Sequence, residues 1–365
     1  MSIMGDNQVQ NAGDASSQLQ VKNLIVMGID EKRAREIVDE KLQELMSTYT
    51  IEAHELMKAR IKKLEDELIP KLVKQKLLDS LADPSIQLLL LDASKSAAST
   101  ERATDTELLS ELLIHRIEKG ENRNVRVGIS RAVKIVDEIS DEALLGLTVM
   151  HAVERYRPVC TQLDDGLKIL SNIFENIIYG QLPQGKKWLD HLDILDAIRI
   201  LPLTKNNSIK EIYTNAMSGF TDVGIVKSSE SYKKAIEILE KANLSENLLI
   251  PHDLRDGYVR LGIMNIERLD LVRLVENDNG IINVKKLNEE QKQAYRDVYA
   301  LYERDEMKLQ ANKDAFMERW NKYDSLKNVN EWWNSITDGL SITSVGEALA
   351  HANAKRCEPQ LPEIE

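Results

Sequence analysis

The sequence predicts a mainly α-helical protein. We expect a multi-helix bundle as its body, a short β-hairpin or β-arch before the bundle, and an α+β part after it. Aromatic residues make up only 5% of the 365 residues, so Leu, Ile, Val and Ala supply most of the apolar side chains, which favours helices over strands. Apolar residues also recur every three or four positions through most of the chain, which is the period of an amphipathic helix.

Residues 1–29 differ in composition from the rest, because Gln, Asn, Gly, Ser and Asp dominate them. Two short alternating runs, Gln8–Gln10 and Gln18–Val21, are linked by a segment that begins with the turn-rich Asn11–Asp14. This pattern predicts a hairpin or arch. Because a two-stranded unit is only marginally stable in water, we expect it to pair with copies of itself as an oligomerisation segment. A flexible tail is the alternative.

Residues 30–80 predict an amphipathic helical stalk with Asp30 as a plausible N-cap. An apolar stripe in its second half advances in steps of four and three residues, as in the seam of a coiled coil. A helix packed within its own domain would show the same stripe. Pro70 lacks a backbone donor and should kink or restart the helix. The stripe consists of Met57, Ile61, Leu64, Leu68 and Leu72.

Residues 81–205 predict a compact domain of helices. Asp83-Pro84 marks the first helix, because a capping residue precedes proline at the first helical position. Glycine, proline or a capping residue separates most of the later helices. The predicted helices are Ser85–Ala98, Thr106–Lys119, Asn122–Ile139, Ser140–Val153, Asp164–Tyr179 and Lys187–Ile200.

Residues 206–356 predict a mixed α+β domain, and residues 357–365 a tail. The order of elements is compatible with an embellished winged-helix module. Asp253 is the expected cap of one of its helices, and Asn277–Gly280 is typical of a tight turn. Trp332 and Trp333 cannot face the same way, so we expect one in the core and one partly exposed at a contact surface. The predicted helices are Ser231–Ala242, Asp253–Leu261, Ile266–Val275, Asn288–Trp320 and Val345–Lys355, and the predicted strands are Ile281–Val284 and Leu340–Thr343.

Charge and cysteine content limit the classes of function. A formal net charge of −12 argues against a general nucleic-acid coat, which needs clustered Lys and Arg. The chain has two cysteines, Cys160 and Cys357, which are too few for a disulfide framework. Neither a signal-peptide pattern nor an apolar run of membrane-spanning length is visible. These features predict a cytoplasmic protein without membrane contact. Arg157 could lower the pKa of the Cys160 thiol, but we expect a buried, inert thiol.

The segment from Arg116 to Lys134 carries a local excess of positive charge, opposed by Glu118 and Glu121. This excess predicts a surface that faces a phosphate group or a protein partner. Ion pairs with acidic faces of neighbouring helices are the alternative. The residues are Arg116, Lys119, Arg123, Arg126, Arg131 and Lys134.

No phosphate-binding lysine loop, dinucleotide fingerprint, metalloprotease helix or nucleophile elbow is present in the sequence. We therefore assign no catalytic, cofactor-binding or metal-binding residue. Asp190, Asp193 and Asp196 would share one helical face near His191, and aligned carboxylates can bind a hard cation. A solvated acidic face is the alternative, so a metal-dependent hydrolase or nuclease is the least favoured function.

Four stretches resemble an uncharacterised family of bacterial helical proteins: Leu81–Pro84, Leu108–Arg116, Trp188–Asp193 and Ile342–Ala350. The Gln/Gly-rich opening before a charged helix is similar to what such proteins carry. The last stretch is also similar to the end of the abortive-infection alpha family. The resemblance implies a bacterial cytoplasmic protein associated with phage defence. It supplies no catalytic residues.

Together these observations predict a non-enzymatic oligomeric interaction protein in bacterial phage defence or abortive infection. We expect it to self-associate, to have room for other protein partners and to need no cofactor. The alternative is a regulator that binds nucleic acid through the winged-helix-like C-terminal domain or the Arg116–Lys134 surface.

Overall fold

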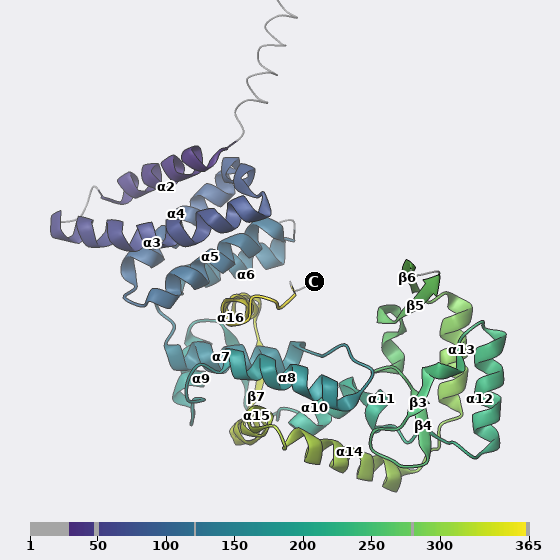
Figure 1. Cartoon of the computed structure of the whole chain (residues 1–365). Coiled ribbons are helices and arrows are strands. Elements are labelled where there is room, and N and C mark those ends of the chain that lie inside the picture. Colours follow the sequence, from purple (N-terminus) through teal and green to yellow (C-terminus); the bar gives the residue numbers. More distant parts are fainter. Residues whose placement is uncertain (1–28, 47–50, 120–121, 279–280, 363–365) are drawn as a thin grey trace, which may run out of the picture. The chain divides into compact units, whose positions relative to one another are not determined.

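The fold is mainly helical, as predicted, with a few small sheets (Figure 1). A computed structural model describes residues 29–46, 51–119, 122–278 and 281–362. The predicted hairpin of residues 1–29 lies outside these residues, apart from Ile29. None of the helices in the described ranges is both long and apolar enough to cross a membrane. The chain forms two compact units, which are described separately. Unit 1 contains the described residues up to 140, residues 194–197 and those from 342 onwards, and unit 2 contains residues 141–193 and 198–341.

Unit 1 is a bundle in which α3 contacts α2, α4 and α5, while α16 packs on α5 and α6 (Figure 1). The apolar stripe of α3, from Met57 to Leu72, is at most 8% exposed. The stripe therefore packs within its own domain, which is the second of the two interpretations, and does not form an exposed coiled-coil seam. The elements are α2 (Glu31–Met46), α3 (Ile51–Gln75), η1 (Leu78–Ala82), α4 (Pro84–Ser99), α5 (Ala103–Glu118), α6 (Arg123–Lys134) and α16 (Ser344–Cys357).

Pro70 lies inside α3, and the helix continues through it to Gln75. Of the two predicted effects of Pro70, the restart is therefore wrong, and the kink stays a prediction. A proline inside a helix costs about 3 kcal/mol, because one hydrogen bond is lost and the ring crowds the preceding turn. Leu68, Ile69 and Leu72 are at most 1% exposed around it. Burial of these side chains offsets the cost of the proline.

Local capping signals fix the starts of two helices in unit 1 as the sequence predicts. The Asp83 carboxylate accepts a hydrogen bond from Ser85 N at 2.7 Å, with Pro84 as the first residue of α4. The Asn122 side chain accepts from Asn124 N at 3.0 Å and so begins α6. Both side chains satisfy backbone donors that the first turn leaves without a partner.

The start of α16 lies against two other parts of unit 1. Thr343 N donates to the carbonyl oxygen of Ala197 at 3.0 Å, and the Thr343 hydroxyl accepts from Gly346 N at 3.2 Å as the helix cap. A Cβ atom at Gly346 would meet the same carbonyl oxygen of Ala197, and one at Gly128 would lie 2.6 Å from the carbonyl oxygen of Ser344. Glycine at both positions therefore permits the close approach.

Unit 2 combines helices with short strands. Strand β1 pairs with β7, β4 lies between β2 and β3 in an antiparallel sheet, and β5 and β6 form a separate two-stranded hairpin. The helices are α7 (Asp141–Arg155), α8 (Leu163–Ile177), α9 (Lys187–Ile194), α10 (Ile209–Ala216), α11 (Ser218–Thr221), α12 (Glu230–Lys241), η2 (Glu246–Leu248), η3 (Ile266–Leu271), α13 (Glu289–Ala300), α14 (Glu306–Trp320) and α15 (Asp324–Ser335). The strands are β1 (Ile198–Leu201), β2 (Ile225–Val226), β3 (Leu249–Pro251), β4 (Tyr258–Leu261), β5 (Arg273–Asp278), β6 (Ile281–Lys286) and β7 (Gly339–Ile342).

Some predicted elements of unit 2 are wrong. The helix predicted to reach Ile200 ends at Ile194, and its last residues belong to β1. The helix predicted over Asp253–Leu261 is a turn followed by β4. Of the helix predicted over Ile266–Val275, the first six residues form the 3-10 helix η3 and the last three begin β5. In each case strand pairing overrides the local helical pattern. The long helix predicted over Asn288–Trp320 is two helices, α13 and α14.

The strands predicted within β6 and β7 are confirmed. The β5–β6 register runs from Arg273 opposite Lys286 to Asp278 opposite Ile281. The winged-helix interpretation of this region stays a prediction.

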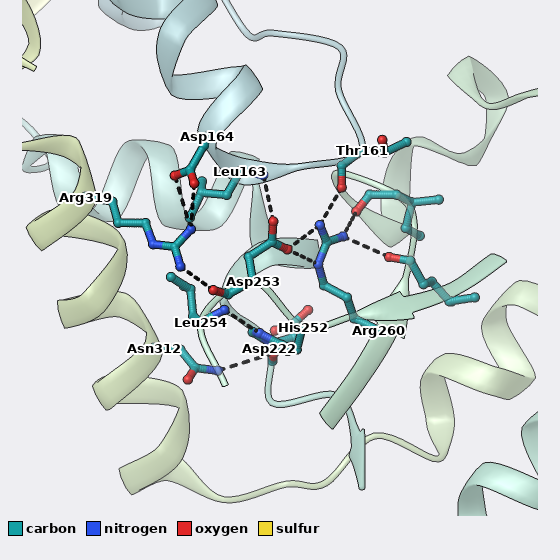
Figure 2. Close-up of polar contacts among 12 residues, drawn as sticks. Thr161, Leu163, Asp164, Asp222, His252, Asp253, Leu254, Arg260, Asn312 and Arg319 are labelled. Atoms are coloured by element: carbon teal, nitrogen blue, oxygen red, sulfur yellow. Dashed lines mark hydrogen bonds and ion pairs between the residues drawn. The ribbon is translucent and has the colours of Figure 1, made fainter. Parts of the chain in front are cut away.

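A buried ion pair between β4 and the turn before it organises unit 2 (Figure 2). Arg260 is fully buried, its guanidinium stacks 4.3 Å from the Phe220 ring centroid, and its Nε donates to Asp253 Oδ2 at 2.7 Å. The other oxygen, Asp253 Oδ1, accepts from Leu163 N at 2.9 Å, at the first residue of α8. Asp253 was expected to cap a helix of its own, which does not form. It instead caps α8 from far along the sequence.

Further polar contacts extend this network to α14 (Figure 2). Arg319 holds both oxygens of Asp164 at 3.1 Å and also donates to the backbone oxygen of Asp253. The Asn312 amide donates to the backbone oxygen of Thr221 at 2.9 Å. Because a buried charge is tolerated only with partners, this network fixes how β4, α8 and α14 pack.

Both tryptophans of the Trp332-Trp333 pair are buried, at 3% and 4% exposure. The expectation that one is partly exposed is therefore wrong. Trp332 Nε1 donates to the Pro183 carbonyl and Trp333 Nε1 to the Asn207 carbonyl, each at 2.8 Å. Helix α15 contacts both α8 and α10, so adjacent residues can face different partners and still be buried.

Candidate functional site at the α5–α6 end of unit 1

The six basic residues singled out in the sequence fall into three groups in unit 1. Arg116 lies in the last turn of α5 and is only 7% exposed. Its Nη2 donates to the Ser85 hydroxyl at 3.1 Å, while its buried Nε has no acceptor among the described residues. Arg116 is therefore anchored, with part of its hydrogen-bonding capacity unused.

Lys119, Arg123 and Arg126 form the second group, where α5 ends and α6 begins. Arg123 is exposed, and Lys119 and Arg126 are half-buried. None of the three forms an ion pair within the part of the chain that the structure describes. Arg123 and Arg126 are three residues apart on α6 and share a face. We call Arg116, Lys119, Arg123 and Arg126 the basic cluster.

Positive charges lie close together in the basic cluster. Burial lowers the pKa of the Arg116 guanidinium, and the neighbouring charge of Arg126 lowers it further, while Asp83 acts in the opposite direction. A fully charged Arg116 therefore lies near a second cation with limited compensation from within unit 1. Like charges in this arrangement favour an external anion.

Arg131 and Lys134 form the third group, because acidic side chains of unit 1 already pair with them. Arg131 contacts Asp196 at 2.6 Å, and Lys134 contacts Asp92 at 3.2 Å. For these two residues the alternative prediction, ion pairs with acidic side chains of neighbouring elements, is therefore confirmed. Of the six basic residues in the predicted surface, Arg131 and Lys134 are therefore neutralised by ion pairs. The positive charge that is not ion-paired to a described residue lies in the basic cluster.

Two buried histidines lie beside the basic cluster. The rings of His115 on α5 and His351 on α16 are 5.6 Å apart between centroids. Burial lowers the pKa of each to about 4, and Lys119 and Lys355 lower that of His115 further. Both rings are therefore neutral at pH 7. This pair was not predicted, because nothing in the local sequence pattern links α5 to α16.

The acidic residues of the predicted cation site do not share one helical face. Asp190 and Asp193 are exposed on α9, but the helix ends at Ile194. Asp196 lies beyond that end with a φ of 59° and pairs with Arg131. The predicted alignment is therefore wrong for Asp196. Across the described ranges, no group of three or more His, Cys, Asp or Glu side chains is arranged to hold a metal ion.

The cysteine thiols are shielded from ionisation. Burial raises the pKa of the Cys160 thiol to about 11, and Arg260 opposes this rise only in part. Burial also raises the pKa of Cys357. Because the thiolate is the reactive form, the position of Arg157 in the sequence does not activate Cys160.

A cavity of about 540 Å³ that is open to solvent lies in unit 2 and was not predicted from the sequence. Its lining comes from the end of α7, the β1–α10 loop, α10, α15 and β7. Such a cavity has no sequence signature, because each element contributes only one to four residues. Its polar lining includes Arg157, Lys205 and Glu211, with the Trp333 ring among them.

Comparison with known protein families matches most of the chain to a family model. A family model whose description reads only ":-like" matches residues 28–361. No curated protein and no solved structure matches the chain.

Proposed function

The chain belongs to this family, whose model covers most of its length, and we propose that it is a non-enzymatic interaction protein that binds a nucleic acid through the basic cluster. The observation that supports this function is the placement of Lys119, Arg123 and Arg126 without an ion pair among the described residues, next to the anchored Arg116. A phosphate backbone would supply the missing negative charge.

The position on α6 adds to this proposal. Arg123 and Arg126 lie in the first turns of the helix, where the helix dipole also favours an anion. The net charge of −12 limits such binding to this end of unit 1. We therefore expect a local contact with few phosphates, sensitive to salt, in place of a coat along the nucleic acid.

The test is binding of fluorescently labelled single-stranded and double-stranded oligonucleotides, followed by anisotropy over a range of salt concentrations. The full chain should bind at low salt. The variant Arg123→Gln/Arg126→Gln should bind more weakly, with a salt slope smaller by about 2, because each lost phosphate contact removes about one unit.

The matched control is Arg131→Gln/Lys134→Gln, which removes the same charge from the same helix. Asp196 and Asp92 already neutralise those two residues, so binding should change little. Absence of binding at low salt, or equal weakening by both double variants, would contradict the proposed function.

Self-association in a bacterial, cytoplasmic defence setting completes the proposal. Self-association would use residues 1–29 and not the α3 stripe, because α3 packs that stripe within its own unit. The resemblance of Ile342–Ala350 to the end of the abortive-infection alpha family supports a role in phage defence. The two free thiols suit a reducing cytoplasm.

A further inference from the structure

We propose that the cavity of about 540 Å³ in unit 2 binds a small organic anion, whose carboxylate or phosphate group is held by Arg157 and Lys205. This site is separate from the basic cluster and does not depend on the proposed nucleic-acid binding. The evidence is the hydrogen bonding of Arg157, the absence of an ion pair to Arg157 or Lys205 among the described residues, and the hydrogen-bonded wall of the cavity.

Arg157 has a fixed guanidinium with unused donors. Its Nη1 donates to the carbonyl oxygens of Val153 at 2.9 Å and Tyr156 at 2.7 Å, and its Nη2 donates to that of Glu154 at 3.4 Å. The guanidinium also lies 4.5 Å from the centroid of the Tyr213 ring. The Nε–H and one Nη2–H have no acceptor within the described chain. Two such donors are what a planar carboxylate or a phosphate needs for a bidentate contact.

The two cations of this cavity, Arg157 and Lys205, form no direct ion pair with a described carboxylate. Arg157 is half-buried and forms no ion pair with any described residue. Burial lowers the pKa of its guanidinium and the charge of Arg268 adds to this, while Tyr213 and Glu154 oppose it only in part. Lys205 lines the same cavity, is exposed and also forms no ion pair there. A half-buried cation such as Arg157, whose hydrogen-bond partners are neutral carbonyl groups, is costly. A bound anion would remove this cost.

The acidic residues of the lining limit the ligand to a single anionic group. The Glu211 carboxylate is turned toward Ser208, whose backbone N donates to it at 2.8 Å in the capping box of α10. Glu154 also lines the cavity and would repel a second negative charge. The volume lies within the roughly 300–1,000 Å³ of small-molecule sites, which is larger than a bare inorganic ion requires.

Hydrogen bonds hold two side chains in the wall of the cavity, Trp333 and Asn206. Trp333 is fixed by its hydrogen bond to the Asn207 carbonyl at 2.8 Å. The Asn206 amide accepts from Leu340 N at 2.9 Å and donates to the Asp338 carbonyl at 3.2 Å. Fixed walls lower the ordering cost of binding.

The experiment measures the thermal midpoint of the full chain with added inorganic phosphate or acetate, against sodium chloride at equal ionic strength. We expect phosphate, acetate or both to raise the midpoint, since a ligand that binds only the folded state stabilises it. A rise with phosphate alone assigns a phosphate group to the ligand, and a rise with acetate assigns a carboxylate. If neither ion raises the midpoint, the proposal is overturned.

Substitutions then locate the binding site. Lys205→Ala should weaken the apparent affinity about tenfold, while Lys227→Ala, an exposed lysine of unit 2 outside the lining, should leave it unchanged. Arg157→Lys keeps the charge but loses the bidentate geometry, and should also weaken binding if it folds. Arg123→Gln/Arg126→Gln should keep the full effect. Loss of the effect in that double variant or in Lys227→Ala, or its persistence in Lys205→Ala, would overturn the proposal.

Discussion

A neutral imidazole packs against a second neutral imidazole where α5 meets α16. His115 and His351 are 7% and 1% exposed, and the charges around them are mostly positive, with Lys119 and Lys355 opposed by Glu111. Protonation of either ring would add a cation to a buried site that already lies near others. This residue pair therefore ties the stability of unit 1 to pH.

We predict that unit 1 loses stability as the pH falls from 6.5 to 4. The pKa of each histidine is about 4 in the folded protein and about 6.5 when unfolded, so the unfolded chain binds more protons in this window. The stabilisation is complete above pH 6.5 and is lost on acidification, by on the order of 3 kcal/mol per histidine. Urea unfolding at several pH values measures it.

The control for this prediction is the double variant His115→Asn/His351→Asn. It should show a flatter dependence of the unfolding free energy on pH between 6.5 and 4. An equally steep dependence in the variant would assign the acid sensitivity to other groups.

Some residue roles could be read from the sequence, and others could not. Asp83 caps α4 because its partner lies two residues away, so a local pattern is sufficient. Lys134 pairs with Asp92, and Arg131 with Asp196. Sequence alone could predict that the Arg116–Lys134 segment is basic, but not which of its charges the fold neutralises.

At the scale of elements, helices could be predicted from local sequence signals, whereas strands depend on partners that are distant in the sequence. The helices α4, α5, α7 and α8 follow their predictions closely, because periodicity and caps are local signals. Strands β1 and β4 were missed, because β1 pairs with β7 and β4 is completed by β2 and β3. The cavity of unit 2 was missed for the same reason, since its lining is assembled from several elements.

Asp253 links elements that are distant in sequence, so its substitution should destabilise more than one of them. We predict that Asp253→Asn lowers the unfolding free energy by about 3–5 kcal/mol, because Arg260 stays charged and buried without a counter-charge. The cap of α8 weakens at the same time. Chemical denaturation followed by tryptophan fluorescence measures the change.

Asp190→Asn, an exposed carboxylate on α9, is the matched control and should change the unfolding free energy by no more than about 0.5 kcal/mol. If the two variants lose similar stability, the Arg260–Asp253 pair is not what holds β4 and α8 together.

At the scale of the whole molecule, the proposed function combines an anion-binding end of unit 1 with self-association through residues 1–29. Neither depends on the cavity of unit 2, so a chain that fails to bind oligonucleotides could still bind a small anion. The three properties therefore call for separate measurements on the full chain.

We predict that the full chain has a larger native mass than a chain that begins at Asp30, as measured by light scattering at matched concentrations. Circular dichroism of the shortened chain checks that it keeps its helical content. Equal, monomeric masses would remove self-association from the proposal and leave nucleic-acid binding untouched.

The position of α16 has a consequence for how the protein is made. This helix packs on α5 and α6, yet it leaves the ribosome only after all of unit 2. Protein synthesis proceeds at about 5–20 residues per second. The sides of α5 and α6 that contact α16 therefore stay uncovered for on the order of 10 s before α16 is made. During synthesis, unit 2 can close first while unit 1 is unfinished, so a nascent chain stalled before residue 344 would expose apolar surface to chaperones and proteases.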